Sequence, residues 1–437
     1  MNTATPSSEP VSLSSALARQ TKATVRPRRI LLYSHDSFGL GHLRRSLSIA
    51  DALVREDPDV GVVIISGSPV SEVFQLPPRC GLVKIPAISK DADGKYVSRG
   101  LPLSLSDVTR VRSELIATTT RTYAPDVILI DHTAEGPGKE LLLMLREVRA
   151  RGDRTRVFLG IRDVIDAPAT VRRQMLASRT YDCIARFYDT VFIYGDPMIL
   201  DVAAAYALPP RVIDKLEYVG IASPGRAFPA EKESASARAG DSSGAFDSDI
   251  LVTAGGGEDG EFLLRAALAA VRGPLRERNF HVTLVTGPLM PSNRWQALQR
   301  DWDADSHVRL IRHVSGAHRL IRRARLVVTM GGYNSVYESL QCGARTLVVP
   351  RVRPRKEQLE RGRRLSGLGL LDLVEPADAA DPGKFAAAIE RCLDRAPASA
   401  PSRLRFDGAR RAAQRLLGIA GSCDNPDAIE GEFSPCA

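Results

Sequence analysis

The feature that most constrains the fold is a regular alternation of short Val- and Ile-rich runs with longer amphipathic stretches. The amphipathic stretches, such as Arg45–Glu56 and Gly138–Arg149, predict helices. The apolar runs predict strands at Arg29–Tyr33, Val60–Ile65, Leu82–Ile85, Asp126–Asp131, Arg156–Ile161, Thr190–Tyr194, Ile250–Thr253, His281–Val285, Val308–Ile311, Leu326–Thr329 and Thr346–Val349. Strands that alternate with helices form parallel sheets with crossover helices. The sequence therefore predicts an α/β fold.

The alternation stops once, between Ala222 and Asp249, where the chain is polar and rich in Ser, Gly and Ala. Such a composition is typical of a linker. We expect a disordered tail over residues 1–27, an N-terminal domain over 28–221, a linker over 222–248, a C-terminal domain over 249–418 and a polar tail over 419–437. The chain after Pro376 is predicted to be helical to about Gly418. Two doubly wound Rossmann-like domains that face each other would place a ligand cleft between their strand ends.

The composition indicates which classes of partner and which cellular compartment to expect. A formal net charge of +9 suits phosphates, nucleic acid or an anionic lipid surface. Nucleic acid is not expected, because the sequence has no zinc-ligand spacing or RNP motif and only 5% aromatic residues. The six cysteines are scattered without a CxxC pair, which indicates a reducing compartment. No apolar run approaches the ~18 residues of a membrane span, and residues 1–27 lack the apolar core of a secretory signal. We expect a cytoplasmic protein.

Three glycine-rich clusters each follow a predicted strand and precede a predicted helix: Ser34–Ser46, Thr253–Phe262 and Thr329–Ser339. Glycine allows close backbone approach, and a helix N-terminus offers free N–H groups and a positive dipole end to an anion. None of the clusters is a Walker A loop, and the first has Arg44 where a GxGxxG motif needs its last glycine. These turns favour a diphosphate ligand. The alternative for each is a strand-to-helix turn without a ligand.

The third cluster continues into residues suited to a nucleotide sugar. Glu338 follows Gly332 by six positions, so its carboxylate can accept hydrogen bonds from a ribose diol. The alternative is a solvated helix glutamate. The basic loop beyond the next strand contains Glu357 and Gln358, which can bind sugar hydroxyls. Its arginines can meet phosphates or form a solvated basic face; they include Arg351, Arg353 and Arg355.

At these residues the sequence resembles the GT-B glycosyltransferases of the family that includes MurG, which adds N-acetylglucosamine to a lipid-linked peptidoglycan precursor. The stretch MGGYNSVYESLQCGARTLVVP followed by RKEQ is similar to the family's donor-site signature, and GLGH resembles its first glycine turn. The resemblance implies a GT-B fold with a UDP-sugar site. The donor-binding residues that it implies are Gly41, Gly256, Gly257, His313, Val314, Gly331, Gly332, Asn334, Ser335, Glu338, Glu357 and Gln358.

The resemblance also implies roles within this site. Glu338 would bind the ribose, His313 and Val314 the uracil, and Glu357 with Gln358 the donor sugar. The family usually has glutamine where this chain has Glu357, which leaves the donor sugar open. The expected reaction is inverting transfer of a hexose or N-acetylhexosamine from a UDP-sugar to a lipid-linked or glycan acceptor.

His42 is the first candidate for the base that takes the acceptor's proton, because histidine titrates in the useful range. Its alternative role is to orient a phosphate. Asp131, His132 and Asp36 are further candidates, and the alternative for Asp131 is a cap on the following turn. We expect no metal and no cofactor besides the nucleotide sugar, since helix N-termini and arginines can stabilise the leaving diphosphate.

Two alternatives to a transferase remain open. A nucleotide-sugar hydrolase or epimerase of the same fold would need the same donor site. A non-catalytic subunit would hold a lipid-linked acceptor for a partner. The positive charge further suggests salt-sensitive peripheral contact with the anionic inner face of a membrane.

Overall fold

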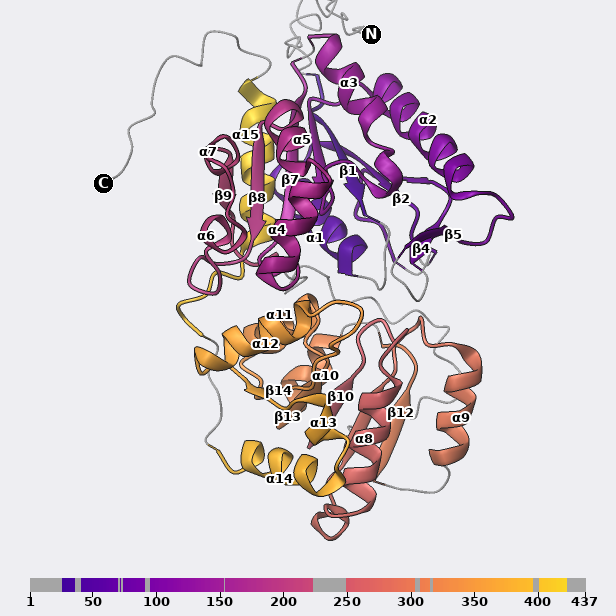
Figure 1. The fold of residues 1–437 in the computed structure, drawn as a ribbon, viewed down its shortest axis with the longest axis vertical. Helices are drawn as coiled ribbons and strands as arrows, with labels where there is room; N and C mark the ends of the chain where they lie inside the picture. Colours follow the sequence, from indigo (N-terminus) through magenta and orange to yellow (C-terminus); the bar gives the residue numbers. More distant parts are fainter. Residues whose placement is uncertain are drawn as a thin grey trace, which may run out of the picture.

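The computed structural model describes residues 26–35, 41–69, 71, 74–90, 95–152, 154–222, 249–302, 307–314, 317–395 and 401–422. Two parallel sheets, each covered by helices, build two domains stacked one on the other (Figure 1). Most of the predicted tails and linker lies outside the described residues, and so does Asp36.

The first sheet is parallel throughout and has the strand order β3-β2-β1-β6-β7-β8-β9. Its strands are β1 (Arg29–Ser34), β2 (Gly61–Ser66), β3 (Cys80–Lys84), β6 (Val127–Asp131), β7 (Arg156–Arg162), β8 (Thr190–Tyr194) and β9 (Leu216–Tyr218). A separate antiparallel hairpin joins β4 (Ile88–Lys90) to β5 (Tyr96–Ser98).

The second sheet repeats this plan with the order β12-β11-β10-β13-β14-β15. Its strands are β10 (Ile250–Thr253), β11 (Val282–Val285), β12 (Val308–Ile311), β13 (Leu326–Thr329), β14 (Thr346–Val348) and β15 (Asp372–Leu373). In each sheet the strand order reverses next to the first strand. The reversal points lie between β1 and β6 and between β10 and β13.

Helices connect the strands and cover both faces of the sheets. In the first domain they are α1 (Gly41–Glu56), α2 (Leu105–Tyr123), η2 (Pro137–Lys139), α3 (Leu142–Ala150), α4 (Pro168–Ala177), α5 (Thr180–Phe187), α6 (Val202–Tyr206) and α7 (Pro210–Ile213). In the second half of the chain they are α8 (Glu261–Arg272), η4 (Arg276–Arg278), α9 (Ser292–Trp302), α10 (Ala317–Arg323), α11 (Tyr333–Gln341), α12 (Glu357–Gly367), α13 (Pro376–Ala379), α14 (Pro382–Leu393) and α15 (Gly408–Ser422).

The apolar character of the strands follows from burial on both faces, as expected of parallel sheets. In β1, Ile30 and Leu32 pack into one core and Leu31 and Tyr33 into the other. The first of these cores continues across the domain boundary to Tyr333 and other residues of α11. The two domains therefore share a hydrophobic contact along α11.

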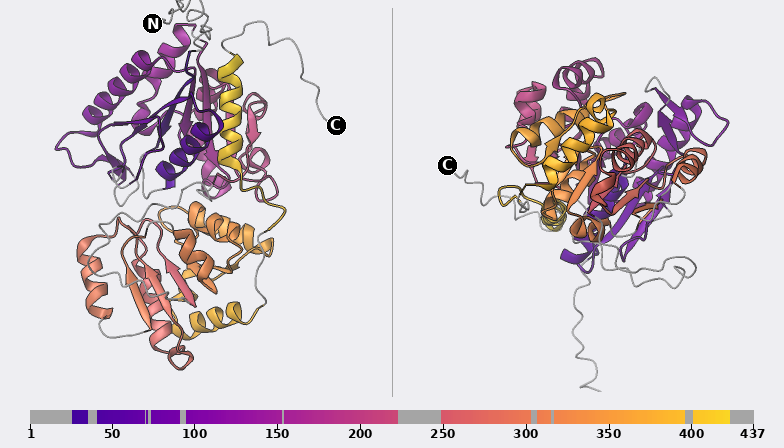
Figure 2. Two further views of the ribbon diagram at one scale, coloured as in Figure 1. Left: turned by 180° about the vertical axis from the view of Figure 1, so that it is seen from behind. Right: turned by 90° about the horizontal axis from the view of Figure 1, so that it is seen from below.

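The last helix corrects the predicted domain boundary. The C-terminal domain was expected to extend to Gly418, but α15 packs against α1 of the first domain (Figures 1 and 2). Its buried residues, among them Leu416 and Ala412, complete the core that contains Ile30. The chain thus crosses between domains twice. The two crossings lie side by side, because the Ile221 amide donates to the Arg405 carbonyl at 2.8 Å.

The predicted α/β class with two doubly wound sheets is confirmed. The predicted strands are present, with ends that differ by at most two residues. The strands that were not predicted are β4, β5, β9 and β15, and each is three residues long or shorter. Such short strands contain too few residues for an alternation to stand out.

Candidate functional site

The reversal points of the two sheets lie beside the ends of β1 and β10, and ligands of doubly wound sheets bind at such strand ends. The N-terminus of α1 follows β1, and the N-terminus of α11 follows β13. The two meet across the domain boundary: a Cβ on Gly41 would lie 3.8 Å from the side-chain nitrogen of Asn334. Two positive helix ends therefore lie next to each other, an arrangement that suits an anion.

His42 and Asp131, the two predicted catalytic residues, are in direct contact. His42 Nδ1 lies 2.5 Å from Asp131 Oδ2, and both side chains are buried. Arg45 Nε donates to the other oxygen of Asp131 at 2.9 Å. The Asp131 carboxylate therefore holds the imidazole and the guanidinium together.

The charges of this group follow from its contacts. Burial alone would raise the pKa of Asp131, but Arg45 and His42 outweigh it and hold that pKa well below the usual range. Burial lowers the pKa of His42, although Asp131 opposes the shift. Asp131 is thus an anion and His42 a neutral imidazole near pH 7. Because an ionised Asp131 can only accept, we assign the proton to the Nδ1 that faces it, which leaves Nε2 as the basic nitrogen.

Two further histidines surround His42. The ring centroids of His35 and His132 lie 5.1 and 4.9 Å from that of His42. His132 follows β6 with a φ of 73°, a left-handed conformation that costs free energy in a residue other than glycine. Its amide donates to the Gly160 carbonyl at 2.7 Å. No group of His, Cys, Asp and Glu in the described ranges is arranged to hold a metal ion.

Glu338, the predicted ribose ligand, is buried on α11 and pairs with Arg44 of α1 at 2.5 Å. This ion pair joins the two domains beside the Gly41–Asn334 contact. The Asn334 Oδ1 is buried and has no hydrogen-bond partner in the described structure. A polar atom of this kind costs free energy unless a ligand or water completes its bonding.

Glu357 and Gln358, the predicted sugar ligands, are buried at the start of α12. The two oxygens of Glu357 accept from Arg162 of the first domain at 2.9 Å and from Arg351 at 3.1 Å. Burial would raise the pKa of Glu357, but Arg162, with smaller contributions from Arg361 and Arg351, lowers it to about 2. Gln358 Oε1 accepts from the Arg351 amide at 2.9 Å.

A fully buried arginine completes the interface. Arg361 of α12 donates to the Gly331 carbonyl in its own domain and to the Val164 carbonyl in the other, at 3.0 and 3.1 Å. It also lies 3.6 Å from the Asp163 carboxylate. The turn at Gly331 is therefore attached through one side chain to the segment that follows β7.

Two of the predicted glycines are required by packing. Gly257 has a φ of 96°, and a Cβ there would lie 2.2 Å from the Thr286 carbonyl. Gly331 has a φ of 85°, and its Cβ would lie 2.8 Å from Val348. Gly256 uses its carbonyl to accept from the Leu289 amide. Gly332 is the N-cap of α11, and Ser335 lies in the first turn of that helix.

His313 and Val314, the predicted uracil ligands, follow β12. His313 is exposed, and Val314 packs with Leu251 and Ile321 on one face of the second sheet. The structure brings in three residues that the sequence analysis did not assign, Arg44, Arg45 and Arg162. Arg45 lies one helical turn after His42, and Arg162 is a charged end to an apolar strand. Either pattern could have marked them as candidates.

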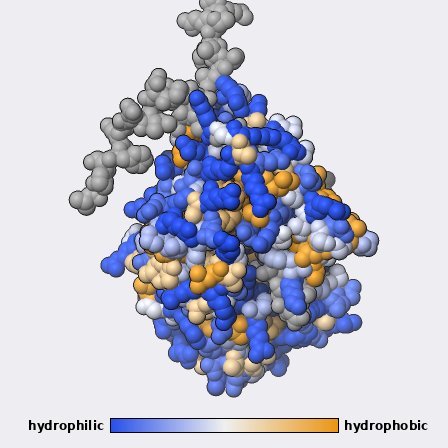
Figure 3. All heavy atoms as spheres, turned by 45° about the horizontal axis from the view of Figure 1, so that its top comes forward, coloured by the Kyte–Doolittle hydropathy of each residue, from blue (hydrophilic) through white to orange (hydrophobic). Residues whose placement is uncertain are grey.

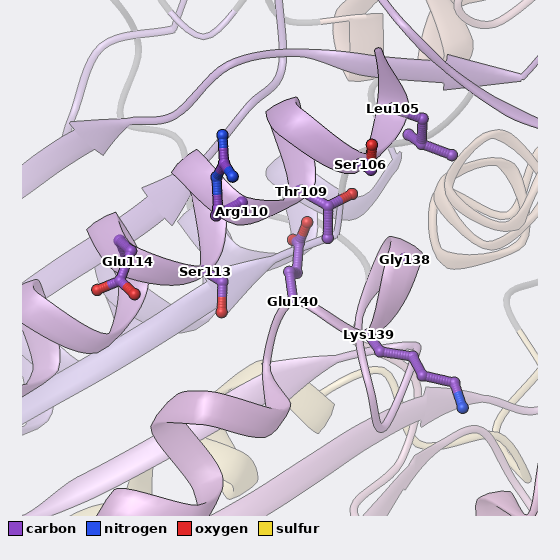
Figure 4. Close-up of a pocket in the computed structure, with 9 residues that line it drawn as sticks. All are labelled: Leu105, Ser106, Thr109, Arg110, Ser113, Glu114, Gly138, Lys139 and Glu140. Carbon is purple, nitrogen blue, oxygen red and sulfur yellow. The ribbon is translucent and has the colours of Figure 1, made fainter.

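A separate hollow of about 490 Å³ lies in the first domain between α2 and residues 138–140 (Figure 4). The labelled side chains that line it include Thr109, Arg110 and Lys139. Its Glu140 carboxylate is engaged by the buried Arg112 at 2.5 and 2.7 Å. Of the two acidic residues that line the hollow, Glu114 and Glu140, the second is therefore paired.

The surface does not display one large apolar area on the face shown in Figure 3, where hydrophobic side chains form small groups among hydrophilic ones. Leu176, Leu103 and Leu101 are among the exposed hydrophobic residues. Within the described ranges, no helix has the length and hydrophobicity needed to cross a membrane.

Comparison with known proteins identifies the fold. No protein-family model and no curated protein matches the chain. The putative UDP-N-acetylglucosamine 2-epimerase from Listeria monocytogenes has a TM-score of 0.58 at 16% identity, over 94% of this chain and 100% of that one. The calicheamicin glycosyltransferase CalG4 has a TM-score of 0.52 at 16% identity, over 94% and 100%. UDP-glucose: anthocyanidin 3-O-glucosyltransferase in complex with UDP has a TM-score of 0.55 at 13% identity, over 93% of this chain and 96% of that one.

The chain thus has the GT-B fold, which glycosyltransferases and UDP-N-acetylglucosamine 2-epimerases share. This likeness does not single out the MurG-like family within the fold.

Proposed function

We propose that this protein is an inverting, metal-independent glycosyltransferase that moves a hexose or N-acetylhexosamine from a UDP-sugar to a lipid-linked or glycan acceptor. The observation that carries the proposal is the His42–Asp131 pair, 2.5 Å apart, at the helix end that meets Asn334 of the other domain. The solved structures of the same fold that contain UDP support a uridine nucleotide as the leaving group.

In the proposed reaction, His42 Nε2 takes the proton of an acceptor hydroxyl, and Asp131 stabilises the imidazolium that forms. The hydroxyl oxygen bonds to the anomeric carbon as the bond from that carbon to the phosphate oxygen breaks. UDP leaves with the electron pair. The N-termini of α1 and α11 stabilise its added negative charge through their free N–H groups.

The donor site is tested by calorimetry with UDP. Replacement of Glu338 by Ala removes a charge-assisted hydrogen bond to the ribose and should cost ~1.5–3 kcal/mol of binding free energy. Glu277→Ala, at an exposed glutamate of η4, is the control and should bind UDP like the wild type. Unchanged affinity in Glu338→Ala would remove this residue from the site.

The proposed metal independence has its own measurement. Turnover of the UDP-sugar should persist in excess EDTA, because helix ends and arginines take the place of a cation. A loss of turnover that manganese restores would contradict the proposal.

An epimerase is the second candidate, because UDP-N-acetylglucosamine 2-epimerases match the fold with TM-scores of 0.58 and 0.57. The two functions give different products when no acceptor is present. An epimerase converts UDP-N-acetylglucosamine into its C2 epimer, whereas the proposed transferase does not. Proton NMR of the sugar nucleotide incubated with the protein alone distinguishes them, and the appearance of the C2 epimer would favour the epimerase.

Contact with an anionic membrane remains part of the proposal, on the basis of the net charge of +9. Electrostatic binding falls as salt screens the charges. Flotation with vesicles that contain an acidic phospholipid should recover the protein at low salt and lose it at high salt. Absence of flotation at low salt would count against membrane contact.

A further inference from the structure

Arg355 is held at the boundary between the domains by the residues that follow it. The Lys356 amide donates to Asp166 Oδ1 of the first domain at 3.0 Å. The Glu357 carboxylate accepts from Arg162 at 2.9 Å. Arg355 itself is half-buried, in the loop between β14 and α12. Its backbone is therefore fixed beside the end of β7.

The other guanidinium groups of this interface have carboxylate partners. Arg162 pairs with Glu357, Arg351 with Glu357 and Asp259, and Arg361 with Asp163. Asp166 already accepts from the backbone amides of Ala167 and Lys356. In the described part of the chain, Arg355 makes no hydrogen bond or ion pair. A half-buried cation without a direct hydrogen-bonded partner loses hydration that an anionic ligand would replace.

Two buried donors lie on the facing domain. Arg162 Nε and His132 Nδ1 have no hydrogen-bond partner in the described residues. They belong to adjacent strand ends, because Asp131 pairs with Gly160 in the parallel register of β6 and β7. Burial holds the pKa of His132 well below its ordinary value, with contributions from neighbouring charges that include Arg162 and Arg355. His132 is thus neutral, and its Nδ1 can carry a proton.

We propose that Arg355, Arg162 and His132 form a subsite for a carboxylate or phosphate group of the substrate. The subsite adjoins the His42 ring, whose centroid lies 4.9 Å from that of His132, and Glu357. The inference rests on the proposed transfer from a UDP-sugar and deepens it, because it selects a substrate with an anionic group; a uronic acid donor would take the place of the neutral sugar named above. The anionic group belongs either to a uronic acid as the donor sugar or to an acceptor that is charged near its reacting hydroxyl.

The test compares UDP, UDP-glucose and UDP-glucuronate by calorimetry on the wild type, Arg355→Gln and Arg353→Gln. Arg353 is an exposed arginine of the same loop and serves as the matched control. Arg162 is left unchanged because it holds Glu357. UDP should bind all three proteins alike. For a uronic acid donor, the wild type and Arg353→Gln should bind UDP-glucuronate about ten to a hundredfold more tightly than UDP-glucose, and Arg355→Gln should lose this preference.

Inorganic phosphate provides the second arm. If the anionic group belongs to the acceptor, UDP-glucuronate should bind no more tightly than UDP-glucose. Phosphate should then bind the UDP-saturated wild type and Arg353→Gln, and it should bind Arg355→Gln at least about tenfold more weakly. The subsite is overturned if Arg355→Gln matches the control for both probes while UDP still binds. If UDP does not bind the wild type, the proposed function fails instead, and phosphate binding without UDP decides the subsite.

Discussion

The carboxylate of Asp131 contacts both His42 and Arg45, and these contacts determine the protonation of His42. Because Asp131 remains ionised beside Arg45, it accepts the Nδ1 proton of His42. The imidazole is thereby locked in one orientation and one tautomer. A histidine that only anchored a phosphate would not need this arrangement, since it would donate to the phosphate as a cation or from either nitrogen.

Replacement of His42 by Ala should lower kcat by ~100- to 10,000-fold, because the acceptor hydroxyl loses its base. UDP affinity should change little. His42→Asn retains a polar group but cannot accept the proton, so it should not restore turnover. Steady-state kinetics and UDP calorimetry on both variants check this. Normal turnover, or a defect confined to donor binding, would make His42 a phosphate anchor rather than the base.

The pH profile offers an independent measurement at the same residue. The base acts only when neutral, and its pKa lies below the ordinary value of about 6.5. Activity should therefore be constant from about pH 8 down to about pH 6.5 and fall only at lower pH. Since Asp131 raises the pKa of His42, Asp131→Asn should shift this acid limb to still lower pH while it reduces kcat. An acid limb above about pH 6.5 would contradict the assignment.

Among the elements, the glycine turn between β10 and α8 depends on its backbone shape. Ala in place of Gly257 must adopt a φ of 96° and meets the Thr286 carbonyl, so it should destabilise the fold by more than about 1 kcal/mol. Gly418→Ala is the matched control. Gly418 lies within α15 with open space around it, so alanine there should stabilise by about 0.5–1 kcal/mol. Urea unfolding measures both, and equal effects would exclude the steric explanation.

Elements whose signal is local could be predicted from the sequence. The strand at Thr190–Tyr194 is a continuous apolar run, and the turn at Gly331 combines a strand end, two glycines and a helix start. The position of α15 could not be predicted, because an amphipathic helix shows that one face is buried but not which domain buries it. The Arg44–Glu338 and Arg162–Glu357 pairs were missed for the same reason, as each joins residues far apart in the chain.

At the scale of the whole molecule, the ionised Glu357 fastens the domains together. Its folded pKa of about 2 lies below its ordinary value, so its contribution to stability is complete above about pH 4.5 and is lost as the pH falls toward 2. Glu357→Gln should remove this part of the acid sensitivity. It also leaves Arg162 and Arg351 without their shared carboxylate, at a cost of about 3–5 kcal/mol near pH 7.

Urea unfolding of the wild type and Glu357→Gln at several pH values between about 2 and 7 checks this expectation. Glu390→Gln on α14, a partly buried glutamate far from the boundary in sequence, is the control. If the free energy of unfolding depends on pH in the same way in the wild type and in Glu357→Gln, then Glu357 does not contribute to the acid sensitivity.

The return of α15 to the first domain has a consequence for how the protein is made. A ribosome completes β1 and α1 early, but the residues that cover that face of the sheet are not translated until the whole second domain has emerged. Leu47 and Leu53, both buried in the finished protein, belong to the core that α15 completes. The nascent first domain therefore keeps an exposed apolar surface until α15 is translated. Chaperones bind such surfaces, and stalled or truncated chains would aggregate through them.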